Sequence, residues 1–241
     1  MITPSFQLNL KIPSITLLNF HIFCITIKYS LFFERYLLII ALSKIRERVL
    51  FMKLLKEKIC NEGKFLDGNI LKVDGFLNHQ MDIRLVNEMG KEFAKRFQAC
   101  PVDRILTVEA SGIGIAAIAS QYFGYVPVVF AKKNRSGNLS PNVYSAEVFS
   151  FTKKKTNHIM VDKEYIKKGD NVLIIDDFLA TGSAALGLCS IVQQAQANVS
   201  GAGIVIEKSF QEGRQLLEKK GIKVESLARV SRIEKGHIEL L

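Results

Sequence analysis

The sequence predicts an α/β fold with a central parallel sheet flanked by helices and a small hood over the ligand site. After Met52, short apolar runs alternate with segments of helical periodicity. The runs at 104–108, 171–175 and 201–206 lack the apolar/polar alternation of a strand with one wet face, so both their faces should be buried. Such a βα alternation places the loops that follow the strands along one edge of the sheet, where ligands bind.

The predicted elements follow in regular order after Met52. One expected helix is capped by Asp82 and carries Ile83, Val86, Phe93 and Phe97 on one face. The other expected helices are Lys53–Asn61, Ile115–Tyr122, Ala184–Gln196 and Gly213–Lys219. The expected strands are Arg104–Val108, Val126–Ala131, the hairpin strands Val143–Phe151 and His158–Val161, Asn171–Ile175, Gly201–Ile206 and Lys223–Leu227. A polar stretch, Lys132–Asn142, is predicted to be a mobile loop.

The first 51 residues differ from the rest, since they contain no glycine and no aspartate and are dominated by Ile, Leu and Phe. Lys28 and the pair Glu34-Arg35 interrupt the apolar stretch 15–42, so no membrane span of about 18 apolar residues is present. A secretory cleavage pattern is also missing. We interpret residues 1–51 as an atypical extension of a domain at 52–241. Three interpretations stay open: an upstream region read as protein with Met52 as the natural start, a peripheral membrane anchor, or a soluble extension.

The formal net charge of +10 predicts an anionic partner. The charge is dispersed, with Lys153-Lys154-Lys155 as the one tight run, which favours a phosphorylated small molecule over nucleic acid or a membrane surface. The four cysteines and four histidines are scattered, which argues against a zinc site or a disulfide framework and favours a reducing cytoplasm.

Residues 172–184 form the most informative motif. A four-residue apolar strand leads to Asp176 and Asp177, and Thr181, Gly182 and Ser183 then precede a helix. Hydroxyl donors, a glycine that permits close approach and free N–H groups at a helix start make an anion site. Two carboxylates beside a phosphate are expected to hold sugar hydroxyls or a metal ion, although they could instead cap the following turn.

This strand–acid–loop–helix unit resembles the fingerprint of the type I phosphoribosyltransferases, which bind 5-phosphoribosyl 1-diphosphate with Mg²⁺. The resemblance implies that Asp176 and Asp177 are catalytic and hold the ribose. It also implies a 5-phosphate loop made of Ala180, Thr181, Gly182, Ser183 and Ala184. Ala184 stands where many members have a second threonine, and backbone N–H groups would supply most of the binding.

The segment Glu109-Ala110-Ser111-Gly112 resembles the diphosphate loop of the same family, which implies that Ser111 and Gly112 contact the leaving group. Many relatives carry a basic residue in place of Ser111. Lys132 or Lys133 is then expected to supply the positive charge.

The resemblance covers residues 52–241 and is closest to the bacterial xanthine phosphoribosyltransferases. Its carriers are the segments 70–80, 148–153 and 205–210. It implies transfer of the phosphoribosyl group to N9 of xanthine, with Leu71, Asn78 and Lys208 in the base pocket. It further implies Mg²⁺ that arrives with the diphosphate rather than a metal site of the protein alone, and a cytoplasmic homodimer with no nucleic-acid or membrane partner.

Two other functions compete for these residues. Residues 112–117 fit the dinucleotide pattern G-x-G-x-x-A, but lysines stand where the acidic residue about 20 positions later should be. A purine-responsive transcription regulator with a phosphoribosyltransferase-type sensor domain is the second alternative. Residues 1–51 show no helix-turn-helix pattern to support it.

Overall fold

The computed structural model describes residues 53–66, 70–133, 142–150, 155–234 and 237–241, with isolated positions among residues 35–42. The chain divides into two compact units, Met1–Leu50 and Phe51–Leu241, and the elements below all belong to the second. The interpretation of residues 1–51 therefore lies almost wholly outside the described residues. Within the described part of the chain, no helix is long and apolar enough to cross a membrane.

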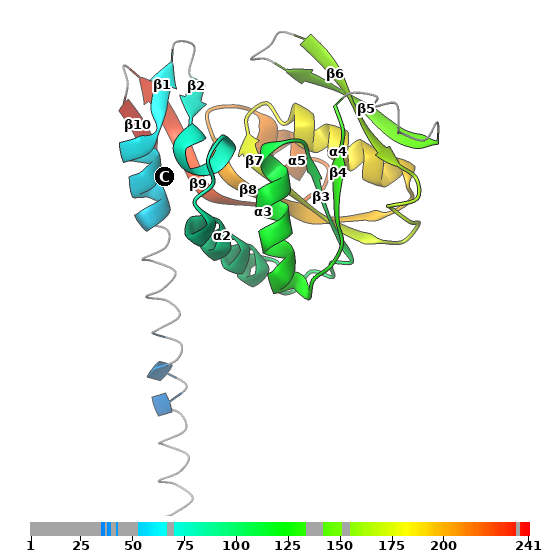
Figure 1. Cartoon of the computed structure of the whole chain (residues 1–241), viewed down its shortest axis with the longest axis horizontal. Coiled ribbons are helices and arrows are strands. Elements are labelled where there is room, and N and C mark those ends of the chain that lie inside the picture. Colours follow the sequence, from blue (N-terminus) through cyan, green and yellow to red (C-terminus); the bar gives the residue numbers. More distant parts are fainter. Residues whose placement is uncertain are drawn as a thin grey trace, which may run out of the picture. The chain divides into compact units, whose positions relative to one another are not determined.

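A six-stranded sheet forms the centre of the second unit, in the order β10-β9-β8-β7-β3-β4 (Figure 1). Its strands are β3 (Arg104–Val108), β4 (Val128–Ala131), β7 (Asn171–Leu179), β8 (Asn198–Lys208), β9 (Val224–Glu234) and β10 (His237–Leu240). All pairings are parallel except that of β10 with β9. The chain runs outward from β3 to β4 on one side and from β7 to β9 on the other. Because the direction of winding reverses between β3 and β7, the carboxyl ends of these two strands are the expected ligand site.

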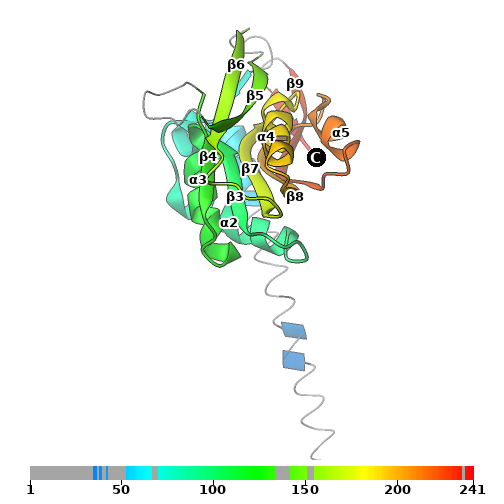
Figure 2. The same cartoon turned by 90° about the vertical axis from the view of Figure 1, so that its right-hand side faces the viewer.

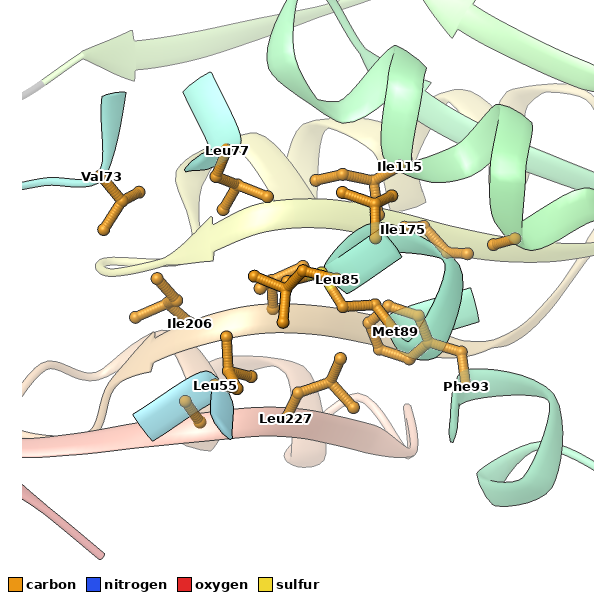
Figure 3. Packing of buried hydrophobic residues seen from close by; sticks show 14 of the residues in the cluster. Leu55, Val73, Leu77, Leu85, Met89, Phe93, Ile115, Ile175, Ile206 and Leu227 are labelled. Atoms are coloured by element: carbon orange, nitrogen blue, oxygen red, sulfur yellow. The ribbon is translucent and has the colours of Figure 1, made fainter. Parts of the chain in front are cut away.

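Helices cover both faces of this sheet, as predicted. Helices α2 (Ile83–Arg96) and α3 (Ser111–Ser120) lie on one face, and α4 (Ser183–Gln194) and α5 (Gly213–Glu218) lie on the other (Figure 2). Each face has its own apolar cluster. Figure 3 shows the first, where side chains of α2 pack against three parallel strands; its labelled members include Leu85, Met89, Phe93, Ile175, Ile206 and Leu227.

The capping of α2 is confirmed, because the Asp82 carboxylate accepts a hydrogen bond from the N–H of Leu85 at 3.1 Å. The prediction that Ile83 shares the buried face is wrong, since this side chain is 58% exposed. Ile83 occupies the first helical position and lies about 100° around the helix from the centre of the buried stripe, at 3.6 residues per turn. The stripe runs through Leu85, Met89 and Phe93 instead.

A small hood is built from the start and the end of this unit. Residues 53–62 are helical, and the strands β1 (Lys64–Leu66) and β2 (Ile70–Lys72) and the π-helical turn η1 (Asp74–Asn78) follow. Lys56 Nζ donates to the carbonyl oxygen of Leu241 at 2.6 Å, which joins the two segments. Their buried side chains belong to the same cluster as those of α2, so the hood is anchored in the core.

An antiparallel hairpin of β5 (Val143–Ser150) and β6 (Lys155–Asp162) extends beyond the sheet, as Figure 1 shows. The N–H of Phe149 donates to Ser183 Oγ at 2.9 Å and ties the hairpin to the start of α4. Lys132 pairs with Met160 through two backbone hydrogen bonds of 2.9 Å, so this residue is not part of a mobile loop. Lys133 and Asn142, at the two ends of the remaining predicted loop, are also described, whereas residues 134–141 lie outside the described residues.

Candidate active site

Two carboxylates at the carboxyl end of β7 form the centre of the site. The sequence predicted that the strand ends at Ile175, but β7 continues to Leu179, so both carboxylates belong to the strand itself. Asp176 is 4% exposed, whereas Asp177 is partly exposed. Asp177 Oδ2 accepts hydrogen bonds from Ser111 Oγ at 2.6 Å and from Asn78 Nδ2 at 3.0 Å. Strand β7, the first turn of α3 and the hood therefore meet at one carboxylate.

Asp176, the buried member of the pair, is costly to ionise. Burial raises the pKa of Asp176 well above its usual range, and the neighbouring charge of Asp177 adds to the rise. The Asp177 N–H, which donates to Asp176 Oδ1 at 3.0 Å, and the charge of Lys133 act in the opposite direction. Because two adjacent negative charges are costly here, the pair favours a ligand that brings positive charge.

The structure distinguishes the two lysines expected near the diphosphate. The backbone of Lys132 is held in the bridge to β6, whereas Lys133 lies close enough for its charge to act on Asp176. The Glu109 carboxylate accepts a hydrogen bond from the Lys133 N–H at 2.5 Å, which fixes the end of this segment beside the acidic pair.

The loop between β7 and α4 is shaped as an anion cradle. Gly182 caps α4 with a φ of 84°, a left-handed conformation that glycine adopts without steric cost. The first N–H groups of α4 have no acceptor within the helix and face the loop. Thr181 and Ser183 are partly exposed, and Ser183 uses its oxygen to accept from Phe149, so its hydroxyl hydrogen stays available to a phosphate.

The predicted diphosphate loop is shorter than expected, because α3 begins at Ser111 rather than at Ile115. Ser111 and Gly112 therefore form the first turn of a helix, where N–H groups again lack intrahelical acceptors. A Cβ at Gly112 would lie 2.0 Å from Thr107 Oγ1, so only glycine fits there. Among the described residues, Thr107 Oγ1 is the one buried side-chain N or O atom without a hydrogen-bond partner.

Of the three residues expected at the base, Lys208 and Asn78 lie at the edges of the site. Lys208 ends β8, and its Nζ lies 6.0 Å from the centroid of the Phe178 ring; burial lowers its pKa. Asn78 is exposed at the end of η1 and contacts Asp177. Leu71 is 5% exposed and packs in the core, so its contact with a base stays a prediction.

Sequence reasoning did not single out Phe178 as a site residue. Its position directly after the acidic pair was the available signal, since it shares the strand that carries both carboxylates. Its partly buried ring beside Lys208 offers a flat apolar surface.

Within the described residues, no three His, Cys, Asp or Glu side chains gather as a metal site. Mg²⁺ in phosphate chemistry is commonly held by one or two carboxylates together with substrate oxygens and waters. The carboxylate oxygens of Asp176 and Asp177, two adjacent acidic side chains at the end of β7, fit this mode.

Comparisons with known proteins identify the family of the chain. The family described as "Phosphoribosyl transferase domain" matches residues 81–234. Xanthine phosphoribosyltransferase 2 of Clostridium botulinum is 59% identical over 187 residues, which cover 78% of this chain and 98% of the relative. Xanthine phosphoribosyltransferase 1 of Clostridium perfringens is 60% identical over the same length and shares, and the Laribacter hongkongensis enzyme is 56% identical.

Solved structures share the fold. Adenine phosphoribosyltransferase from Saccharomyces cerevisiae superposes with a TM-score of 0.62 at 21% identity and covers 74% of this chain and 99% of its own. The adenine phosphoribosyltransferase from Thermoanaerobacter pseudethanolicus gives a TM-score of 0.55 at 26% identity, over 61% of this chain and 82% of its own. With the family match and the close relatives, these likenesses show that the chain belongs to the phosphoribosyltransferase family.

Proposed function

We propose that this protein transfers the 5-phosphoribosyl group from 5-phosphoribosyl 1-diphosphate to N9 of xanthine, giving xanthosine 5′-monophosphate and diphosphate. The observation that carries the proposal is the convergence at Asp177, which hydrogen-bonds Ser111 of α3 and Asn78 of the hood next to the phosphate cradle of α4. The choice of xanthine is supported by the 56–60% identity to enzymes of that name.

The residues divide the reaction into three tasks. The loop from Ala180 to Ala184 holds the 5-phosphate and so fixes the sugar. Asp176 and Asp177 hold the ribose hydroxyls and stabilise the positive charge that develops at C1 as its bond to the diphosphate oxygen breaks. The first turn of α3 and Lys133 stabilise the departing diphosphate. The N9 lone pair of xanthine forms the new bond to C1, and the base releases one proton.

Mg²⁺ is proposed to enter with the diphosphate, and when bound it supplies positive charge that neutralises the leaving group. Asp176 and Asp177 are the residues that would hold such an ion, and both lie at the carboxyl end of β7. No side chain needs to act as a nucleophile.

Base recognition is assigned to two hydrogen-bond donors. Lys208 has three N–H donors and no acceptor, so it suits the 6-oxo group of an oxopurine and cannot accept from the amino group of adenine. Asn78 Nδ2 carries two hydrogens, so one can remain on Asp177 while the other donates to the 2-oxo group. We further propose that the Phe178 ring packs against the base beside Lys208, and that Leu71 supports this pocket.

A homodimer and a cytoplasmic location stay predictions from the family resemblance. The regulator alternative needs a DNA-binding module in residues 1–51, most of which lie outside the described residues. No feature of the described site favours it.

Product analysis tests the proposal. The full chain is incubated with xanthine, 5-phosphoribosyl 1-diphosphate and Mg²⁺, and both products are quantified by chromatography. We expect xanthosine 5′-monophosphate and diphosphate in equal amounts, and a loss of at least about tenfold in Asp177→Asn, since a hydrogen bond to a charged group contributes about 1.5–3 kcal/mol. Asp103→Asn is the matched control, because Asp103 precedes β3 at the opposite end of the sheet. Absence of the nucleotide product, or equal activity of the two variants, would contradict the proposal.

A further inference from the structure

Glu207, the residue before Lys208, is a charged side chain buried in β8 and only 1% exposed. Arg214 donates to its two oxygens through Nε at 2.9 and 3.0 Å and through Nη2 at 2.6 Å. Three further side chains donate to the same carboxylate: Ser226 at 2.5 Å, Ser209 at 2.9 Å and Arg229 at 3.1 Å. The sheet, the turn after β8 and helix α5 are therefore joined at one group.

The electrostatics show that this carboxylate is ionised in the folded protein. Burial acts to raise the pKa of Glu207, but the hydrogen bonds from Arg214 and Ser226 outweigh it and lower the pKa to about 2. Separating the two partners of a buried ion pair would leave an uncompensated charge in the protein interior, which is strongly unfavourable. Glu207 and Arg214 therefore keep a fixed position relative to each other.

Glu207 and Arg214 are the first and last residues of one eight-residue segment. One end of this segment adjoins the proposed base-binding lysine, and the other adjoins the phosphate cradle. At the first end, Lys208 directly follows Glu207 and lies beside the Phe178 ring. At the second end, Gly213 directly precedes Arg214 and donates its N–H to the carbonyl oxygen of Ala180 at 3.0 Å.

The second end is packed tightly against the phosphate cradle. A Cβ on Gly182 would lie 2.9 Å from Gly213 Cα, and a Cβ on Gly213 would lie 2.4 Å from the carbonyl oxygen of Ala180. Arg214 also donates to Glu218 at 2.9 Å and to the carbonyl oxygen of Val224 at 3.1 Å, which fixes α5 on β9. Because Gly213 and the cradle are packed so tightly together, a displacement of Arg214 would shift the cradle as one unit relative to Lys208.

We propose that the Glu207–Arg214 ion pair is a positioning device that sets the distance between the base-binding Lys208 and the 5-phosphate cradle. The inference rests on the proposed function, which assigns those two sites to the two ends of one nucleotide. Neither residue of the pair touches the reacting atoms. A nucleotide that must satisfy both sites at once is sensitive to their spacing, whereas a ligand that occupies only the cradle is not.

Arg214→Lys tests this role, because it keeps the charge but loses the two-pronged contact. Glu207→Gln is the second variant, which keeps the shape and loses the charge. Glu92→Gln is the matched control, since Glu92 is 2% exposed and pairs with Arg96 at 2.9 Å in α2, away from the site. Calorimetric titration measures the dissociation constants of xanthosine 5′-monophosphate and of ribose 5-phosphate, and thermal melting shows how much each variant is destabilised.

The proposal predicts that Arg214→Lys and Glu207→Gln weaken binding of the nucleotide by about tenfold or more and that of ribose 5-phosphate by less than about twofold. Glu92→Gln should melt earlier, with both dissociation constants unchanged. Equal weakening of the two ligands, or an unchanged nucleotide affinity, would overturn the positioning role while the proposed function stands. Failure of the wild-type protein to bind the nucleotide would overturn both.

Discussion

Replacing Gly182 with alanine separates the two reasons why a glycine stands in the phosphate loop. Its φ of 84° costs an L-residue about 1–2 kcal/mol in the left-handed region. Gly169 has nearly the same φ, 85°, and a Cβ there would meet nothing within 4 Å. Gly169→Ala therefore reports the backbone cost alone, while Gly182→Ala adds the contact with Gly213 Cα at 2.9 Å.

The magnitude follows from that contact. An ordinary Cβ contact begins near 3.4 Å, so Gly213 and the start of α5 must move by about half an ångström, beside the 5-phosphate. Since a misplacement of about 1 Å can cost 10²-fold in rate, we expect kcat/KM for 5-phosphoribosyl 1-diphosphate to fall by about 10- to 100-fold in Gly182→Ala. Gly169→Ala should stay within about twofold of wild type. Urea unfolding should show a loss of about 1–2 kcal/mol in Gly169→Ala and at least as much in Gly182→Ala. Unchanged kinetics in Gly182→Ala, or parallel losses in both variants, would refute the assignment of the loop.

Three further predictions concern the acidic pair, the base and the extension. Because the pKa of Asp176 is raised in the folded state, stability falls as the pH rises from about 4, the ordinary carboxyl value, toward the raised pKa. Asp176→Asn removes that loss, so the variant should lose activity yet have a higher melting temperature than wild type at neutral pH. Each kcal/mol of regained stability should raise the melting temperature by about 2–4 °C, and the difference should shrink toward pH 4. A melting temperature below that of wild type at pH 7 would contradict this prediction. Asn78→Ala should narrow the preference for xanthine over hypoxanthine by about threefold to tenfold, since one neutral hydrogen bond contributes about 0.5–1.5 kcal/mol, and equal losses for both bases in steady-state kinetics would remove Asn78 from base recognition. A chain that starts at Met52 should fold and turn over substrate like the full chain, and loss of either in a direct comparison would show that residues 1–51 belong to the domain.

The sequence predicted those parts of the fold that depend on local pattern. Strand β3 at Arg104–Val108 and the helix capped by Asp82 were both predicted correctly. A buried strand appears in the sequence as a short apolar run and a capped helix as an acidic residue before an apolar periodicity, so both patterns lie within a few neighbouring residues. The phosphate loop was recognisable for the same reason, since strand, acids, glycine and helix are contiguous at 172–184.

Features that depend on contacts between residues far apart in the sequence could not be predicted from local pattern. The sequence does not show that β7 continues past Ile175, because its neighbour β8 stabilises that extension through pairs such as Phe178 with Ile206. The extension gives Asp176 and Asp177 different environments. The Glu207–Arg214 pair was likewise hidden, since two of its partners, Ser226 and Arg229, come from β9.

Steady-state kinetics with a panel of four bases tests the central claim most directly. With 5-phosphoribosyl 1-diphosphate and Mg²⁺ held at saturation, kcat/KM is measured for xanthine, guanine, hypoxanthine and adenine. The arrangement of Lys208 and Asn78 predicts the highest value for xanthine, because each side chain donates to one of its two oxo groups. It predicts no measurable transfer to adenine, because the ammonium group of Lys208 cannot accept a hydrogen bond from the adenine amino group. Efficient transfer to adenine, or no transfer to xanthine, would contradict the account.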